Sequence, residues 1–379
     1  MTRFLFAACL PGSEAALKSD VARRHPTLRF AFSRPGFVTF RAADDAADDS
    51  SPPLRSTFAR TWGYSLGKAV GADAHGLARD CWTLVAAHRA REGVAQFKHL
   101  HVWQRERALP GDEGFDPTAA TPAQEAGALL LARLPKAETP PSLNAEVPHG
   151  EAVLDCVLVE PHEWWVGWHR AQSPETRWPG GVPQLHAPAN MISRAYLKIE
   201  EALRWAELPI RSGDRCVEIG SAPGGSCAAL LERGCLVTGI DPAEMDPAVL
   251  ANPRFTHLRA RARDVPRAAF RGARWLMSDT NVAPKHTLDT VEAIVAARDV
   301  RLEGLVLTLK LTDPRLAGEL PAFHKRIRGW GYEHVRARQL AFNRQEVCVV
   351  ATERVAARTI PTEAAQEAEP AKKLRRGKR

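Results

Sequence analysis

The segment from Cys216 to Gly225 limits what this chain can fold into more than any other part of it. Its residues, Cys-Val-Glu-Ile-Gly-Ser-Ala-Pro-Gly-Gly, read as a buried strand that breaks into a glycine-rich turn. Such a turn lets the backbone approach a ligand closely. A second apolar strand, 235–240, is followed by Asp241, at a position where a carboxylate often binds ribose hydroxyls. Strand, glycine turn, helix, strand and acid together predict a nucleotide-type pocket.

The spacing of the glycines narrows the choice of ligand. They fall at positions 220, 224 and 225 and are interrupted by Pro223, so they do not follow the G-x-G-x-x-G pattern of dinucleotide folds. The G-x-x-x-x-G-K-[ST] loop that cradles a polyphosphate is also missing from the sequence. A nucleoside ligand without a polyphosphate is therefore favoured over a nicotinamide dinucleotide or a nucleoside triphosphate.

The sequence after residue 190 predicts a Rossmann-like α/β domain over 191–356. An amphipathic helix is expected at 193–205. Strands are expected at 215–219, 236–240, 255–258, 275–278, 302–310, 332–337 and 346–351. Strands separated by helices indicate a largely parallel, doubly wound sheet, and the short gap before the last strand favours a hairpin at one edge. A cofactor then belongs at the carboxyl ends of the strands.

Residues 1–170 have the pattern of a separate α+β region. Strands are expected at 4–10, 28–33, 37–41, 81–87, 100–104, 153–159 and 164–169, and helices at 14–23 and 53–60. The stretch 108–146 is rich in Ala, Pro and Glu and is expected to be a loop insertion with one helix at 123–133. The Pro/Gly-rich segment 171–190 is a linker, and 357–379 is expected to be a basic, disordered tail.

Composition sets further bounds on class and location. A length of 379 residues suits two domains, and the net charge of +8 indicates a polyanionic partner such as nucleic acid. The seven cysteines never form a C-x-x-C pair, so we expect no disulfide framework, no zinc site and a cytoplasmic location. His162, His169 and His186 also lack metal-ligand spacing, and no metal is expected. No apolar run is long enough to cross a bilayer.

Charged residues recur at or beyond the ends of the expected strands. Asp241, Asp264 and Asp279 follow successive strands, and Lys310 ends the apolar run Leu-Val-Leu-Thr-Leu-Lys. Each has an ordinary explanation when taken alone, because such acids are often helix N-caps and most lysines at strand ends reach for solvent. Three acids in order nevertheless suggest a ligand. Asp241 would take ribose hydroxyls, Asp264 an adenine edge, and Asp279 the region where a methyl donor meets its acceptor.

The ordered motifs of the second half resemble a known family. Ser193-Arg194-x-x-x-Lys198, the Ala-Pro-Gly-Gly turn, Ser-Asp279, Leu-Lys310-Leu and Arg344-x-Glu-Val follow one another as they do in FtsJ-type ribose 2'-O-methyltransferases. Within that family the chain is most similar to the RlmM type, which acts on a cytidine of large-subunit (23S) ribosomal RNA. The resemblance implies that the N-terminal region is a THUMP-like RNA-binding module. Glu218 and Ser226 depart from the family, which more often has an aspartate and an aromatic residue there.

The resemblance also implies roles for individual residues. The family's Lys-Asp-Lys-Glu tetrad falls on Lys198, Asp279, Lys310 and Glu346. S-adenosyl-L-methionine is then expected to bind the residues Ser193, Gly220, Ser221, Ala222, Pro223, Gly224, Gly225, Asp241, Asp264 and Asp279. Lys310 would be the general base, with its pKa lowered by burial and by the neighbouring Lys198, while the two acids hold the ammonium groups. The implied partner is 23S rRNA or its precursor, bound by a monomer.

Three alternatives remain open. A 5-methylcytosine enzyme needs a cysteine nucleophile, and an amino-nitrogen methylase usually shows [DN]-P-P-[FYW]; Ser278-Asp279-Thr280-Asn281 fits neither. A catalytically silent RNA-binding or ribosome-assembly protein would keep the fold without the reaction.

The cluster Trp164-Trp165-Val166-Gly167-Trp168 also has two interpretations. It either stacks on RNA bases or forms a core strand with alternate tryptophans facing inward, and the alternation favours the core strand.

Overall fold

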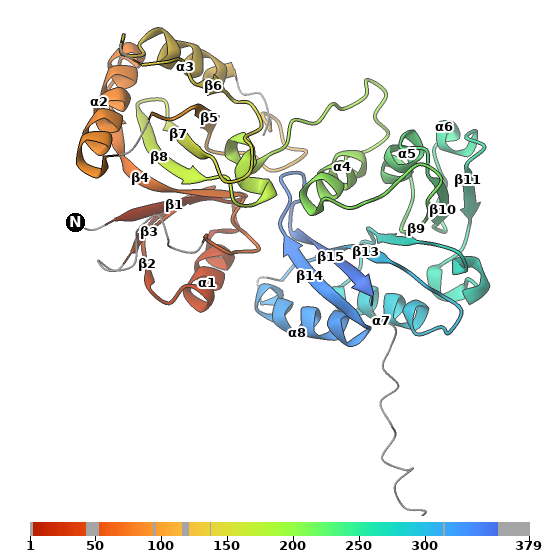
Figure 1. Ribbon diagram of the computed structural model, residues 1–379. Helices are drawn as coiled ribbons and strands as arrows, with labels where there is room; N and C mark the ends of the chain where they lie inside the picture. The colour runs from red at the N-terminus through yellow and green to blue at the C-terminus, as the bar shows by residue number, and fades with distance from the viewer. Residues whose placement is uncertain are drawn as a thin grey trace, which may run out of the picture.

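The computed structural model describes residues 3–42, 53–93, 96–115, 121–136, 138–313 and 315–354. Within them the chain forms two lobes, each built on its own β-sheet (Figure 1). The basic tail expected at 357–379 lies outside the described residues. No helix among these residues is long and apolar enough to span a bilayer.

The N-terminal sheet has the strand order β2-β3-β1-β4-β8-β7-β5-β6. Its strands are β1 (Phe4–Ala8), β2 (Leu28–Arg34), β3 (Phe37–Ala42), β4 (Thr61–Val70), β5 (His99–Gln104), β6 (Ser142–Leu143), β7 (Ala152–Glu160) and β8 (Glu163–Arg170). Its helices are α1 (Glu14–Arg24), α2 (Ala74–Glu92) and α3 (Thr121–Ala132). The expected α+β character and the helix inside the 108–146 stretch are confirmed.

The tryptophan-rich strand β8 is a core strand, as the alternation predicts. Trp164 and Val166 pack in one hydrophobic cluster together with residues of α2, and Trp168 packs against it. Trp165 lies on the other side of the strand and packs against a second cluster that contains Phe37. Both faces of this strand are therefore occupied by the protein's own side chains.

Two expectations for this region are wrong. Residues 81–87 are not a strand but the middle of α2, whose buried residues Leu77, Cys81, Trp82 and Val85 recur at helical spacing. The Asp73 carboxylate caps the start of this helix, and Gly93 ends it in the left-handed conformation. Residues 53–60 are irregular instead of helical.

Strand β4 was not anticipated because glycines interrupt its sequence. Gly63 leaves room for an aromatic ring, since a Cβ there would come within 2.6 Å of Phe6. Gly167 on the paired strand β8 faces the same ring at 2.3 Å. The glycines thus serve close packing across the sheet, which a pattern of strand propensity does not register.

The C-terminal sheet has the order β11-β10-β9-β12-β13-β15-β14. Its strands are β9 (Arg215–Ile219), β10 (Leu236–Ile240), β11 (Phe255–Leu258), β12 (Trp275–Ser278), β13 (Gly304–Lys310), β14 (Tyr332–Arg338) and β15 (Glu346–Arg354). Its α-helices are α4 (Ala195–Ala206), α5 (Gly225–Glu232), α6 (Pro247–Leu250), α7 (Pro284–Val295) and α8 (Leu316–Gly329). β9 to β13 pair in parallel, while β15 runs antiparallel to both β13 and β14, which confirms the expected doubly wound sheet and edge hairpin.

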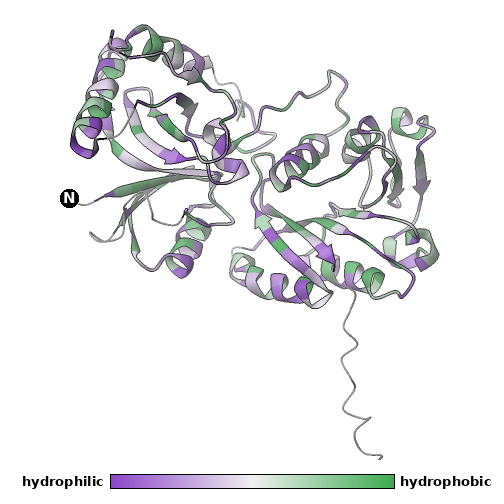
Figure 2. Ribbon diagram, in the orientation of Figure 1, coloured by the Kyte–Doolittle hydropathy of each residue, from purple (hydrophilic) through white to green (hydrophobic). Residues whose placement is uncertain are grey.

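Helices cover both faces of this sheet (Figure 1). Val217 and Ile219 of β9 pack with α7 and α8 on one face. Cys216 points to the other face, where it packs with α4 and α5. This alternation is the two-residue period of a strand buried on both sides. Figure 2 shows hydrophobic and hydrophilic residues mixed along the helices, as expected when one side of each helix faces a sheet.

Arg338, at the end of β14, joins the two lobes. Its buried guanidinium donates to the backbone carbonyls of Arg60 and Gly181, at 2.9 Å in both cases. The next residue, Gln339, donates its N–H to the Thr57 carbonyl at 2.7 Å. Gly181 belongs to the segment 171–190, which contains the short 3-10 helices η1 (Pro174–Arg177) and η2 (Pro179–Gly181). A buried charged side chain therefore takes part in this contact, beside the apolar cluster of Val182, Ala341 and Phe342.

His169 of β8 is held by a buried ion pair to β7 and by a hydrogen bond to this segment. His169 donates from Nδ1 to the Asp155 carboxylate at 2.5 Å and from Nε2 to the Thr176 carbonyl at 2.7 Å. Burial alone would lower the pKa of His169, but the carboxylate and the carbonyl outweigh it, and the pKa is raised. Because both ring nitrogens face acceptors, the charged imidazolium is the form that satisfies both contacts.

We expect His169→Gln to lower the free energy of unfolding by about 3 kcal/mol at pH 6, because it breaks a buried pair. A raised pKa contributes stability that is complete below the unfolded value of 6.5 and disappears as pH rises through the folded value. The difference between the wild type and the variant should therefore shrink at alkaline pH. Urea unfolding at several pH values measures it, with the exposed His162→Gln as control. A difference that does not change with pH would contradict the charged form.

Candidate active site

The glycine turn follows β9 and packs against the end of β12. Gly220 and Gly224 have φ values of +79° and +117°, in the region that favours glycine. A Cβ at Gly220 would lie 2.7 Å from the carbonyl oxygen of Asp279, so no larger residue fits without movement. α5 begins at Gly225, and the free N–H groups of its first turn open toward the loop.

Two polar side chains beside this turn have capacity for a ligand. The Asp241 carboxylate accepts the N–H groups of Ala222 at 3.2 Å and Ala243 at 2.8 Å. A carboxylate has about four acceptor positions, so further hydrogen bonds can form. The Ser193 hydroxyl is buried against Gly225 and has no hydrogen-bond partner among the described residues. An orphaned buried hydroxyl beside a glycine turn is typical of a site that a ligand completes.

Four charged side chains form a closed ring next to the turn. Lys198 Nζ lies 3.2 Å from Asp279 Oδ2 and 2.5 Å from Glu346 Oε1. Lys310 Nζ lies 2.9 Å from Asp279 Oδ1 and 2.7 Å from Glu346 Oε2. Each ammonium therefore contacts both carboxylates, and each carboxylate divides its two oxygens between the two lysines. We call these four residues the ion ring.

The register of the sheet brings the ring together. Lys310 is the last residue of β13 and pairs directly with Glu346, the first residue of the antiparallel β15. Asp279 follows β12, the parallel neighbour of β13. Lys198 comes from α4, which covers the same face. Residues that are more than 140 positions apart in sequence thus meet at one end of the sheet.

The charges of the ring stabilise one another. Burial alone would raise the pKa values of Asp279 and Glu346, but the two lysines outweigh it, and both values are lowered. Burial would likewise lower the pKa of Lys310, yet the two carboxylates raise it above its usual 10.5. The expected lowering of the Lys310 pKa is therefore wrong for this structure, because two anions outweigh both burial and the second ammonium.

A buried carboxylate on α4 binds the backbone of the segment that precedes Glu346. Glu201, one turn after Lys198, accepts the N–H groups of Ala341 at 2.9 Å and Phe342 at 3.3 Å. These residues belong to the turn that leads into Glu346. Burial raises the pKa of Glu201. Glu201 was not predicted as a site residue, because its only signal in the sequence is an acid in the apolar stripe of an amphipathic helix.

The other predicted cofactor residues divide into two groups. Gly220 to Gly225 and Asp241 lie together, joined by the hydrogen bond from Ala222 to Asp241. Ser221 is buried in the same turn, with its hydroxyl 3.6 Å from Met245 Sδ. Asp264 lies in the 3-10 helix η3 (Ala262–Asp264), is exposed, and pairs only loosely with Arg263, at 3.7 Å. The described contacts do not connect it to the turn.

Glu218 is a second acid whose place the sequence did not reveal. It is buried on β9 and accepts the Cys227 thiol at 2.9 Å. Burial raises the pKa of Glu218 to about 7, and the nearby Asp279 and Asp241 carboxylates add to this effect. A hollow of about 20 Å³ lies between Glu218, Lys198 and Asp279. That volume holds about one water molecule, which would have several polar partners there.

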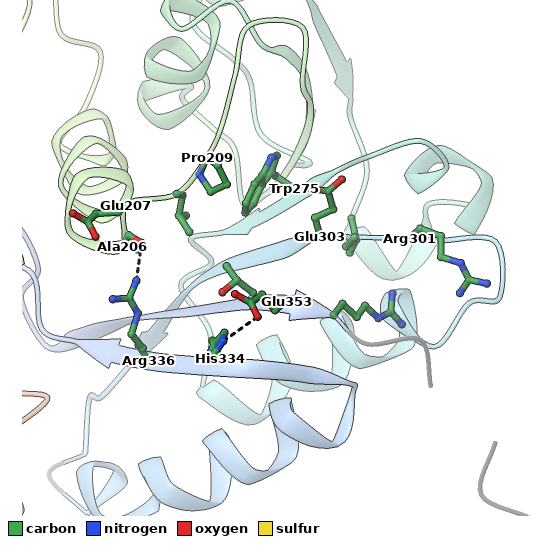
Figure 3. Close-up of a pocket in the computed structure, with 13 residues that line it drawn as sticks. Ala206, Glu207, Pro209, Trp275, Arg301, Glu303, His334, Arg336 and Glu353 are labelled. Atoms are coloured by element: carbon green, nitrogen blue, oxygen red, sulfur yellow. Dashed lines mark hydrogen bonds and ion pairs between the residues drawn. The ribbon is translucent and has the colours of Figure 1, made fainter. Parts of the chain in front are cut away.

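A large cavity lies away from the ring. It measures about 910 Å³ and opens at the start of β12 and β14, the opposite ends of the sheet from the glycine turn (Figure 3). His334 and Glu353 form an exposed pair at 3.0 Å in its wall, and Arg336 is held by the Ala206 carbonyl at 2.6 Å. None of the ring residues lines it. The volume of a cavity alone therefore does not identify the candidate active site.

Comparisons with known proteins agree with the motif order. A sequence model of the FtsJ-like methyltransferase family matches residues 191–314. Ribosomal RNA large subunit methyltransferase M of Halorhodospira halophila is 33% identical over 193 residues, covering 50% of this chain and 55% of that protein. Its counterpart in Methylococcus capsulatus is 34% identical over 184 residues, covering 45% and 50%. The chain spans about half the length of these relatives.

Solved structures give weaker matches. Fibrillarin from Aeropyrum pernix, with natively bound S-adenosyl-L-methionine, aligns with 52% of this chain and 81% of its own, with 16% identity and a TM-score of 0.34. A similarity of this size carries no argument about this chain.

The family match covers the glycine turn, Lys198, Asp279 and Lys310, and Glu346 lies beyond its end. Residues 191–314 of this chain therefore match the sequence model of the FtsJ-like methyltransferase family.

Proposed function

We propose that this protein transfers a methyl group from S-adenosyl-L-methionine to a ribose 2'-hydroxyl of RNA, at a cytidine of 23S ribosomal RNA. The observation that carries the proposal is the ion ring at the carboxyl ends of β12 and β13, directly beside the glycine turn. The relatives named ribosomal RNA large subunit methyltransferase M support the choice of RNA. We further propose a monomer that acts in the cytoplasm, with a THUMP-like N-terminal region that binds RNA.

The residues around the turn fit the cofactor. Asp241 has acceptor capacity for ribose hydroxyls, and the Ser193 hydroxyl lacks a partner among the residues that the structure describes. Gly220, Gly224 and Gly225 let the turn pack closely against Asp279, Met245 and Ser193, which a Cβ at these positions would meet within 3.0 Å. S-adenosyl-L-methionine, when bound, supplies an electrophilic methyl group on a sulfonium.

Lys310 is suited to take the proton of the attacking hydroxyl. An ammonium has three N–H donors, and Lys310 directs two of them to Asp279 and Glu346. The third position remains for the substrate. If that proton is lost, the neutral amine keeps both anchors and presents its lone pair to the hydroxyl. Asp279 and Glu346 thus fix the direction of the base in either protonation state.

Lys198 maintains the charge balance while this occurs. It contacts the same two carboxylates as Lys310, so its positive charge remains when Lys310 is neutral. The repulsion between the two ammonium groups also favours loss of the Lys310 proton. Base methylation through a cysteine nucleophile is disfavoured, because all seven cysteines are buried.

Nucleotide-resolution mapping of ribose methylation in 23S rRNA tests the function. A strain lacking this protein should lose one 2'-O-methyl group, and the wild-type gene should restore it while a Lys310→Ala gene should not. Purified Lys310→Ala should still bind S-adenosyl-L-methionine. Loss of no ribose methyl group would point to the silent RNA-binding alternative, and loss of a base methyl group to base chemistry. Near-normal turnover by Lys310→Ala would remove Lys310 from the role of base.

The rate of methyl transfer should rise with pH. The pKa of Lys310 is raised, so at neutral pH only a small fraction carries the neutral amine. Below the pKa that fraction, and with it the single-turnover rate, should increase about tenfold per pH unit. Rapid-quench measurements between pH 6.5 and 9 with saturating cofactor and RNA provide the profile. A flat profile would mean that proton removal from Lys310 does not precede the transfer.

Asp241→Ala should weaken binding of S-adenosyl-L-methionine by about 10- to 100-fold, because hydrogen bonds to a charged group are among the stronger ones. Isothermal titration of the purified variant measures this directly. Glu244→Ala is the matched control, since that side chain lies three residues further on and is 82% exposed. Equal affinities for the two variants would place Asp241 outside the cofactor site.

A further inference from the structure

A loop of the N-terminal region reaches the methyltransferase domain at the ion ring. The segment 109–115 forms a turn in which Asp112 donates its N–H to the Leu109 carbonyl at 2.9 Å. The turn then contacts the second lobe at three points: Arg194 donates to the Pro110 carbonyl, Arg344 binds Asp112, and Phe115 packs edge-on against Phe342. Both arginines belong to the methyltransferase side of the contact.

The two arginines belong to the two chain segments that carry Lys198 and Glu346. Arg194 lies one helical turn before Lys198, and its carbonyl accepts the Lys198 N–H at 3.1 Å. Residues separated by four positions share a helix face, so Arg194 and Lys198 lie on the same side. Arg344 lies two residues before Glu346 in the sequence. Its neighbour Asn343 donates a side-chain hydrogen bond to the Glu346 carboxylate at 3.4 Å.

The groups that these arginines bind resemble the oxygens of a phosphate. Arg344 Nη2 lies 2.6 Å from Asp112 Oδ1, and the two side chains are 43% and 46% exposed. An ion pair with that exposure contributes little to stability. Guanidinium groups bind carboxylate and phosphate oxygens in the same geometry. Pro110 and Asp112 are at most about 7 Å apart along the chain, so the two guanidinium groups converge on a short stretch.

The charge and position of this site match an RNA backbone. A ribose that reaches Lys310 has a phosphate on each side of it, and these phosphates must pass the rim of the ring. Arg194 and Arg344 lie four and two residues from Lys198 and Glu346, so both cations are carried by the segments that present the ring. Phosphate contacts of this kind position a strand without reading its sequence.

We propose that Arg194 and Arg344 bind the RNA phosphates on either side of the target ribose, and that Asp112 occupies Arg344 in the free protein as a stand-in for phosphate. This inference rests on the proposed function, because it takes RNA as the substrate. RNA displaces the Asp112 carboxylate from Arg344 when it binds, and the N-terminal loop thereby competes with the substrate for one cation.

Asp112→Asn tests the competition. The amide keeps the size of the side chain and an acceptor for the Leu109 turn, but it lacks the charge that holds Arg344. We expect the full-length variant to bind a fluorescently labelled, cytidine-containing single-stranded RNA about two- to fivefold more tightly than the wild type. A purely structural role for Asp112 predicts the opposite, because loosening the loop would weaken the contact between the lobes.

Glu113→Gln is the matched control for general charge. Glu113 is exposed, adjacent to Asp112, and forms no hydrogen bond or ion pair among the described residues. Its removal deletes the same charge from the same loop without freeing Arg344. If Glu113→Gln tightens RNA binding as much as Asp112→Asn does, or if neither changes it, the proposal is overturned.

Arg344→Gln provides the second arm. It should weaken RNA binding and reduce the slope of log affinity against log salt by roughly 0.7, the value for one phosphate contact on a single strand. In the Arg344→Gln background, Asp112→Asn should give no further gain, because the two residues act on one another. A gain in affinity that persists would assign the effect to another cation.

These experiments are equilibrium binding measurements, so their outcome does not depend on whether methyl transfer is detected. Absence of ribose methylation by the wild type would instead refute the proposed function.

Discussion

The ion ring of Lys198, Asp279, Lys310 and Glu346 is the interaction on which the rest of the site depends. Four charges with little access to water are tolerable only because each faces two of the opposite sign. Removal of any one side chain leaves an uncompensated charge among the other three. The resulting loss of stability is larger than the stability that an exposed ion pair contributes. The positions of α4, β12, β13 and β15 are therefore tied to one another through their charges as well as through their packing.

The ring is also linked to the contact between the lobes. Glu201 and Lys198 lie one turn apart on α4, and Glu201 holds the turn that leads to Glu346. That same turn begins just after Arg338, which donates to the Arg60 and Gly181 carbonyls of the other lobe. A shift of the N-terminal lobe would act on the backbone that presents Glu346. The region proposed to bind RNA and the region proposed to carry out the reaction thus share one short, buried segment.

The sequence predicted local elements far better than contacts between distant parts. The strands of the C-terminal sheet and the glycine turn follow from apolar runs and glycine spacing, and the motif order placed Lys198 and Glu346 beside Lys310. The helix α2 was predicted in part as a strand because Cys81 to Val85 is apolar, and its caps at Asp73 and Gly93 carried the stronger signal. The contact of Asp112 with Arg344 joins residues 232 positions apart, and no local pattern indicates it. The raised pKa of Lys310 likewise depends on how two strands pair.

That raised pKa describes the ring at rest, and under the proposed function it also sets how readily Lys310 can act as a base. With both lysines charged, the ring is neutral overall, and the proton on Lys310 is held by two carboxylates. Loss of this proton leaves a net negative charge in a half-buried place, which is unfavourable. A positive charge brought next to the ring offsets that cost and lowers the pKa of Lys310, since like charges disfavour protonation. Under the proposed function, a bound cationic methyl donor would favour the neutral amine of Lys310, so the electrostatics that assembles the ring would also limit its reactivity to the occupied site.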